Sequence, residues 1–81
     1  MIMEKHKIKI YSTPTCAWCN IAKQFFKEHK IEFEEIDVSQ DTLAAQEMVK
    51  KSGQIGVPVI EIDNKIIIGF NEQKIRDSLN I

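Results

Sequence analysis

The chain has 81 residues, and its 11 lysines and arginines against 12 aspartates and glutamates give a formal net charge of -1. This length predicts one domain over residues 1–81 with a single small core. The mixed charges favour neither a nucleic acid nor an anionic membrane as a partner. Residues 1–7 do not resemble a signal peptide, and no apolar run approaches the ~20 residues of a membrane span, so we expect a cytoplasmic protein without membrane contact.

The first half of the chain predicts a strand, a helix and a strand. Residues 5–11 alternate polar and apolar side chains, which is typical of a strand. Over residues 16–30 apolar side chains recur every three or four positions, which predicts an amphipathic helix with Trp18 and Ile21 on its apolar stripe. Residues 31–38 alternate again and predict a second, short strand.

The second half predicts a helix, a hairpin and a final helix. Residues 39–53 form the expected helix, because polar capping residues open it and a glycine closes it. Residues 57–62 and 65–68 predict two strands joined at 63–64, an Asp-Asn pair that tolerates the positive φ of a tight turn. Asn71 is the expected cap of the last helix.

The resulting order, β-α-β-α-β-β-α, predicts an α/β domain with a four-stranded mixed sheet and three helices. In this arrangement the first strand is central and should be buried on both faces. Lys7 and Lys9 conflict with that position, because they alternate with isoleucines as in a half-exposed strand. Long lysine side chains can reach water past the end of a covering helix.

Both cysteines of the chain, Cys16 and Cys19, lie at the start of the first expected helix. Unpaired backbone N–H groups and the positive end of the helix dipole favour a thiolate there. We therefore expect a lowered pKa for Cys16, which makes it the nucleophile. Cys19 lies one turn further along, where its sulfur can attack a mixed disulfide on Cys16. This pattern indicates a redox motif whose two thiols cycle.

Inert packing and a metal site are the alternative interpretations of the two cysteines, and their place at a turn-to-helix junction counts against packing. Zinc takes four ligands, and the additional candidates, His6 and His29, lie on separate elements without paired spacing. We therefore expect no metal. Pro58 raises a different question, because it opens an expected strand. A cis bond after Val57 would explain this position, whereas the rarity of cis bonds favours the trans form from the local sequence alone.

At these positions the sequence resembles the glutaredoxin family. The matching segments, in the order and separation of that family, are Tyr11-Ser12-Thr13-Pro14-Thr15-Cys16-Ala17-Trp18-Cys19, Gly56-Val57-Pro58-Val59-Ile60 and Ile68-Gly69-Phe70. The resemblance covers essentially the whole chain. It implies a thioredoxin-like fold in which a cis-Pro58 faces the two cysteines.

The resemblance also implies which residues hold a substrate. Val57 would offer main-chain N–H and C=O groups to an extended segment. Trp18 falls where the family has a tyrosine and would form an exposed aromatic wall. The alternative is that the Trp18 side chain lies in the core, because Trp18 belongs to the apolar stripe of the helix. The expected substrate-binding residues are Trp18, Val57, Pro58, Gly69, Phe70, Asn71 and Glu72.

The departures from the family pattern lie mainly at positions that the family uses to bind glutathione. Members that use glutathione typically carry a lysine three residues before the first cysteine and a basic residue shortly before the Val-Pro pair, where this chain has Thr13 and Gln54. Each lost contact weakens binding by ~1 to 3 kcal/mol. Glu72 can still pair with the glutathione amino group, while Asn71 is neutral. Ala17 replaces a proline and adds one N–H near the nucleophile.

The resemblance implies a dithiol-disulfide oxidoreductase that reduces protein or glutathione mixed disulfides and maintains cell redox homeostasis, without a bound cofactor and with glutathione as co-substrate. Gly69-Phe70 is also similar to small redoxins that reduce ribonucleotide reductase and are recharged by thioredoxin reductase, although their flanking tryptophan and Arg-Pro are missing. A further alternative is a non-enzymatic dimer holding an iron-sulfur cluster with glutathione, against which the intact cysteine pair counts. The expected partners are disulfide-containing proteins and one of these reductants, with the chain acting as a monomer.

Overall fold

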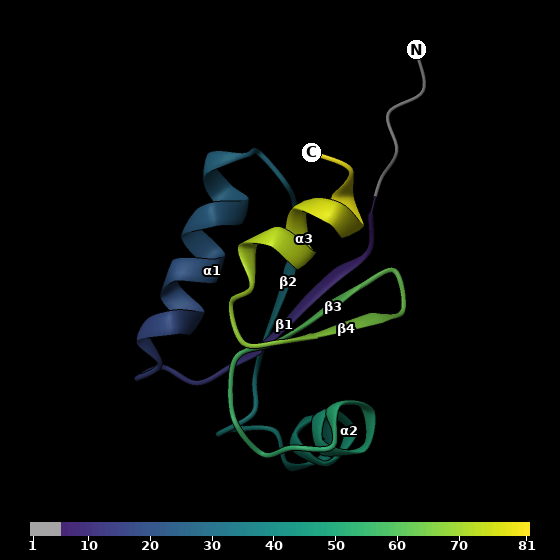
Figure 1. Cartoon of the computed structure of the whole chain (residues 1–81). Helices are drawn as coiled ribbons and strands as arrows, with labels where there is room; N and C mark the ends of the chain where they lie inside the picture. Colours follow the sequence, from purple (N-terminus) through teal and green to yellow (C-terminus); the bar gives the residue numbers. More distant parts are fainter. Residues whose placement is uncertain (1–5) are drawn as a thin grey trace.

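Residues 6–81 are described by the structure, a computed structural model, and follow the expected order β-α-β-α-β-β-α (Figure 1). The elements are β1 (Ile8–Ser12), α1 (Ala17–Glu28), β2 (Glu34–Asp37), α2 (Thr42–Ser52), β3 (Val59–Ile62), β4 (Lys65–Ile68) and α3 (Glu72–Leu79). The strands form one sheet in the order β2-β1-β3-β4, with β1 and β2 parallel and the other pairs antiparallel. The predicted α/β class is confirmed. Lys5, where the first strand was expected to begin, lies outside the described residues.

Three strands begin later than their sequence patterns suggested, and the first of them is β1, because His6 and Lys7 precede its first residue, Ile8. The alternation of residues 31–38 becomes a strand only in its second half, because Lys30 has a positive φ of 56° and the N–H of Ile31 still bonds to a carbonyl of α1. β3 begins at Val59 because Pro58 has no N–H to donate to a strand ladder. For β2 and β3, a backbone N–H that a strand ladder would use is thus either bonded elsewhere or missing.

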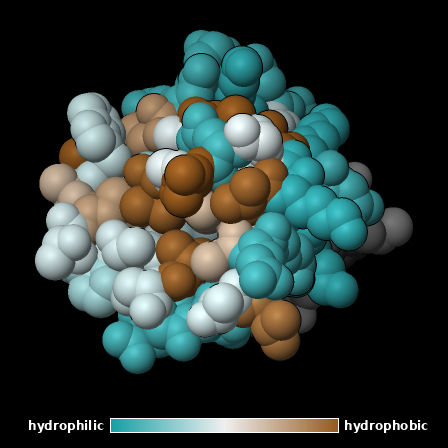
Figure 2. All heavy atoms as spheres, turned by 90° about the horizontal axis from the view of Figure 1, so that it is seen from below, coloured by the Kyte–Doolittle hydropathy of each residue, from teal (hydrophilic) through white to brown (hydrophobic). Residues whose placement is uncertain are grey.

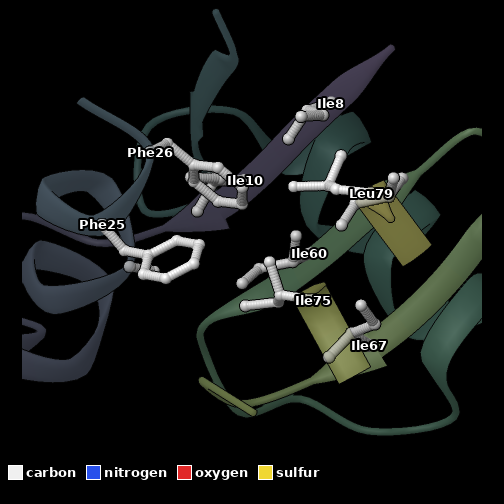
Figure 3. Close-up of a cluster of buried hydrophobic side chains, with 10 residues drawn as sticks. Ile8, Ile10, Phe25, Phe26, Ile60, Ile67, Ile75 and Leu79 are labelled. Atoms are coloured by element: carbon white, nitrogen blue, oxygen red, sulfur yellow. The ribbon is translucent and has the colours of Figure 1, made fainter. Parts of the chain in front are cut away.

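The helices cover the two faces of the sheet unequally. α1 and α3 lie on one face, and α2 lies on the other (Figure 1). The larger cluster of buried side chains fills the space between the sheet, α1 and α3 (Figure 3). Its members are Ile8, Ile10, Ala22, Phe25, Phe26, Ile60, Ile62, Ile67, Ile75 and Leu79. This cluster fixes α1 on the sheet, and α1 begins directly after Cys16.

α2 packs on the opposite face through a smaller cluster, formed by Tyr11, Ala44, Met48 and Val59. The hydroxyl of Tyr11 donates a hydrogen bond to Glu47 at 3.0 Å. Burial raises the pKa of Tyr11, and the bond to Glu47 raises it further. The buried hydroxyl is therefore satisfied as a neutral donor.

Lys7 and Lys9 show how a central strand can carry polar side chains. β1 has a strand on each side, yet part of its α2-facing surface is open, and the two lysines line a hollow of about 380 Å³ beside Lys51 and Glu61. Lys51 donates a hydrogen bond to Glu61 at 2.8 Å, so the rim of the hollow is charged. The lysine side chains reach water there, which explains their alternation with isoleucines.

The connections match the expected turns. Asp63 and Asn64 turn the hairpin between β3 and β4 with positive φ values of 49° and 74°. α2 ends at Gly53, whose φ of 76° is the left-handed conformation that favours glycine. None of the helices in residues 6–81 has the length and apolarity needed to cross a lipid bilayer.

Candidate active site

The cysteine pair lies where β1 ends and α1 begins. After Ser12, a tight turn in which the Cys16 N–H bonds to the carbonyl of Thr13 at 3.3 Å brings the chain to the helix. Cys16 is the capping residue of α1 and not its first helical residue, because its backbone is still extended. Its Sγ accepts a hydrogen bond from the backbone N–H of Cys19 at 3.1 Å. One of the N–H groups that lack a partner within the helix is thus directed at the Cys16 sulfur.

The two cysteine residues differ in their exposure to solvent. The structure joins Cys16 and Cys19 in a disulfide, with their Cα atoms 5.2 Å apart. Cys19 is completely buried, whereas Cys16 is partly exposed. A molecule in solution can therefore reach only Cys16.

A cavity of about 270 Å³ is lined by Trp18, Val57, Pro58, Gly69 and Phe70. The Val57-Pro58 bond is cis, as the family resemblance implied and contrary to the expectation from the local sequence. The N–H of Gly69 donates to the carbonyl of Pro58 at 2.9 Å, which ties together the two loops that line the cavity. Five of the seven expected substrate-binding residues thus surround one opening, and one of them, Trp18, directly precedes Cys19 in the chain.

Trp18 forms an exposed wall of this cavity. Its side chain is 59% exposed, and its ring stacks on that of Phe70 with a centroid distance of 6.4 Å. The alternative of a core position for Trp18 is therefore wrong. Figure 2 views the molecule from below, the side on which α2 lies in Figure 1, and shows hydrophobic residues gathered in the middle of that side with hydrophilic residues around them.

Asn71 and Glu72 do not line the cavity. The Asn71 side chain accepts a hydrogen bond from the N–H of Lys74 at 3.1 Å and caps α3, as the sequence predicted. Glu72 pairs with Arg76 at 2.8 Å. Both side chains are engaged within α3, and Glu72 lines a neighbouring hollow instead.

The charges around the cavity are sparse. No lysine or arginine is among the residues that line it, within the part of the chain that the structure describes. Thr13 and Gln54 are both half-buried, and the backbone N–H of Gln54 bonds to the hydroxyl of Ser52 at 3.2 Å. The two positions where relatives that use glutathione carry basic residues therefore contribute no positive charge.

A polar cluster that the sequence patterns did not reveal joins the end of β1 to α1. Ser12 is completely buried, and its hydroxyl donates to Glu35 at 3.1 Å. Lys23, one turn after Cys19, donates to the same carboxylate oxygen at 2.7 Å. The hydrogen bond from Lys23 holds the pKa of Glu35 below its usual value, and the bond from Ser12 lowers it further. Finding this cluster requires the pairing of β1 with β2, which sequence spacing does not give.

The two histidines are engaged elsewhere. The Nδ1 atom of His6 lies 2.5 Å from Asp63, and the Nδ1 atom of His29 lies 2.8 Å from the carbonyl of Phe25. Among residues 6–81, no three side chains of the His, Cys, Asp and Glu types gather as a metal site requires.

Comparisons with known proteins agree with this geometry. The sequence model described as Glutaredoxin matches residues 8–67. A glutaredoxin-like 8.6 kDa protein in the rubredoxin operon of Clostridium pasteurianum is 50% identical over 68 residues, which span 84% of this chain and 91% of that protein. Glutaredoxin 3 of Escherichia coli K12 is 32% identical over 65 residues, covering 80% of this chain and 78% of the relative.

Solved structures show the same fold. The thioredoxin-like protein BC3987 superposes with a TM-score of 0.83 at 30% identity, covering 89% of this chain and 99% of that one. Glutaredoxin grx-1 from Archaeoglobus fulgidus superposes with a TM-score of 0.84 at 24% identity, covering 93% and 87% of the two chains. Sequence, fold and the Cys16–Cys19 pair together show that this chain belongs to the glutaredoxin family and has the cysteines of a glutaredoxin-like redox protein.

Proposed function

We propose that this protein is a dithiol-disulfide oxidoreductase that reduces protein disulfides and mixed disulfides with glutathione. The observation that carries the proposal is the unequal exposure of two cysteines within bonding distance, Cys16 being accessible and Cys19 buried. Membership of the glutaredoxin family supports the same reaction class.

In the first step the Cys16 thiolate attacks one sulfur of a substrate disulfide. A bond between Cys16 and the substrate forms, the substrate's own S–S bond breaks, and the second substrate sulfur leaves as a thiolate that takes up a proton. The N–H of Cys19, 3.1 Å from the Cys16 sulfur, supports the attacking thiolate with a hydrogen bond. The positive end of the α1 dipole acts in the same direction.

In the second step the Cys19 thiolate attacks the Cys16 sulfur. The bond between Cys16 and the substrate breaks, the remaining substrate thiolate takes up a proton, and the intramolecular disulfide forms. The substrate has then gained two electrons and two protons, and the protein dithiol has been oxidised. Two glutathione molecules, or a reductase of the thioredoxin reductase type, return the two electrons.

The cavity beside the cysteines positions the substrate in this proposal. Val57 precedes the buried Pro58 and offers backbone groups to an extended segment, while Trp18 and Phe70 form an aromatic wall. The family resemblance also implied that Asn71 and Glu72 bind substrate. In our proposal they contact it only at the edge of this site. The substrate therefore meets mainly apolar surface and backbone.

Exchange of each cysteine for serine tests the two roles. Cys16→Ser should lose all reduction of insulin disulfides, because no accessible thiol remains. Cys19→Ser should complete only the first step and accumulate a covalent adduct on Cys16, visible by intact-protein mass spectrometry. A Cys16→Ser variant that keeps its activity, or a Cys19→Ser variant that forms no adduct, would show that the roles are wrong.

The absence of basic residues at positions 13 and 54 supports weak use of glutathione relative to a reductase. Thr13→Lys and Gln54→Lys should each lower the KM for glutathione about fivefold or more, because each supplies one charge-assisted contact to a glutathione carboxylate. Gln46→Lys adds the same charge on the exposed side of α2 and is the matched control. Equal KM values for the control and both variants would contradict this assignment.

A further inference from the structure

A second hollow continues from the cavity beside the cysteines. It has a volume of about 250 Å³ and lies between α1 and the chain that leads into α3, with Ile21, Gln24, Phe25, Glu28, Phe70 and Glu72 around it. Phe70 lines both openings, so the two are adjoining parts of one surface depression. The second hollow has no part in the reaction steps described above.

The wall of this depression is apolar and open to solvent. Trp18 and Ile21 are 59% and 43% exposed, although the helical pattern had placed Ile21 on the buried stripe. They lie three positions apart and therefore project from the same side of α1. Phe70 packs between the openings and stacks on Trp18. A contiguous exposed apolar surface of this kind is typical of an interaction site.

The far end of the depression is negatively charged. Glu28 is the last residue of α1, where the helix dipole disfavours a carboxylate, and within residues 6–81 its side chain has no ion pair or hydrogen bond. Glu72, the other carboxylate, is paired with Arg76, whose guanidinium lies 5.3 Å from the centre of the Phe25 ring. Of the two acids, Glu28 is the one without an ion-pair partner among residues 6–81.

We propose that the two hollows form one docking groove for a polypeptide disulfide substrate that carries an apolar side chain and, further along, a lysine or arginine. The substrate cysteine would meet Cys16, its apolar side chain would lie against Ile21 and Phe70, and its basic side chain would pair with Glu28. This inference rests on the proposed function and specifies its substrate class. Small disulfides fill only the first hollow and gain nothing from the second.

The length of α1 sets the spacing in the substrate. Glu28 lies twelve residues after Cys16, which is about 18 Å at the helical rise. An extended peptide advances ~3.3 Å per residue, so the basic residue lies about five positions from the substrate cysteine. Ile21 is five residues from Cys16, and the apolar residue therefore lies about two positions from that cysteine.

Peptides with a single cysteine test the groove. The cysteine of each peptide is activated as a mixed disulfide with 2-nitro-5-thiobenzoate. Each peptide has leucine two positions and arginine five positions from the cysteine. In one version both residues precede the cysteine, and in the other both follow it. A matched set has glutamate in place of arginine. The second-order rate constant for reaction with the reduced protein should be up to about fivefold higher for the arginine peptide than for the glutamate peptide in one direction, which is the upper end for one exposed ion pair. Rates with hydroxyethyl disulfide provide the reference for a small substrate.

Glu28→Lys should reverse the preference between the two peptides, and Ile21→Ser should reduce the peptide rate relative to the hydroxyethyl disulfide rate. Glu32→Lys makes the same charge change at an exposed position outside the groove and should keep the preference of the parent protein. Equal rates for both peptides in both directions, or the same effect from Glu28→Lys and Glu32→Lys, would show that the groove does not dock the substrate as proposed. A protein that reduces neither the peptides nor hydroxyethyl disulfide would instead refute the proposed function.

Discussion

At the scale of single residues, one backbone hydrogen bond connects the chemistry of the site to the start of a helix. The N–H of Cys19 donates to the Cys16 sulfur, and this contact is also the side-chain cap of α1. A change at Cys16 therefore affects a helix terminus as well as the proposed nucleophile. Serine is the appropriate replacement, because its hydroxyl keeps the cap while removing the sulfur. Alanine would remove both.

The cluster of Glu35, Lys23 and Ser12 predicts a pH-dependent contribution to stability. The bond from Lys23 lowers the pKa of Glu35 from its ordinary value of 4.5. A lowered folded-state pKa gives stability that is present above that ordinary value and is lost as the pH falls through the folded-state value. Glu35→Gln should therefore be less stable at pH 7, within the ~0.2 to 1 kcal/mol of a partly exposed pair, and the difference should shrink in acid.

Urea unfolding of both proteins between pH 3 and pH 7 measures this difference. Glu34→Gln is the matched control on the same strand, because its side chain makes no hydrogen bond or ion pair within residues 6–81. A stability difference for Glu35→Gln that grew as the pH fell would contradict the assigned role of the carboxylate.

At the scale of secondary structure, all three helices begin in the same way. The capping side chains of Cys16, Asp41 and Asn71 each accept a hydrogen bond from the backbone N–H three residues later. Two of these caps are common polar residues, and the third is the proposed nucleophile. One local motif thus both initiates each helix and, in α1, fixes the position of the Cys16 sulfur.

Removal of the other two caps should destabilise the fold. Asp41→Ala and Asn71→Ala should each lower the free energy of unfolding by about 1 kcal/mol, because a backbone N–H at the helix start loses its acceptor. Asp41→Ser and Asn71→Ser should recover most of this loss, since serine also caps helices well. Chemical denaturation monitored by circular dichroism gives these values. Alanine variants as stable as the serine variants would show that the caps are unimportant.

At the scale of the whole molecule, stability depends mainly on the face covered by α1 and α3. Ten buried side chains form the cluster there, whereas four form the cluster beneath α2. The larger cluster joins both ends of the chain, because Ile8 and Leu79 are members. The cysteines therefore lie at the start of a helix that is held by the main core.

A cavity in the larger cluster should be severely destabilising. Ile60→Ala should cost about 2 to 5 kcal/mol, because the side chain is completely buried in a central strand. A domain of this size has a total stability of about 4 to 12 kcal/mol, so the variant should be close to unfolding. Leu43→Ala, at a position that is 77% exposed, should change the urea midpoint little. Similar losses for both variants would contradict this picture of the core.

The order of the elements, the Asp63-Asn64 turn and the Asn71 cap could be predicted from the sequence because each depends on residues that are neighbours along the chain. The exposure of Ile21 could not, because helical spacing fixes the side of the helix but not the width of the face that is covered. The bond between Lys23 and Glu35 depends on two elements meeting in space. The cis bond at Pro58 was implied only by the family resemblance.

The central position of β1 has a consequence for how the chain is made. Tyr11 pairs with Ile36 on one side and with Val59 on the other. Because β2 precedes β3 in the chain, the partner of one edge of β1 is synthesised well before the partner of the other edge. During synthesis both thiols and their helix emerge together with the first half of the sheet, whereas the segment at Pro58 emerges later. On a ribosome-bound chain, Cys16 and Cys19 therefore emerge before the loops that line the cavity have been made.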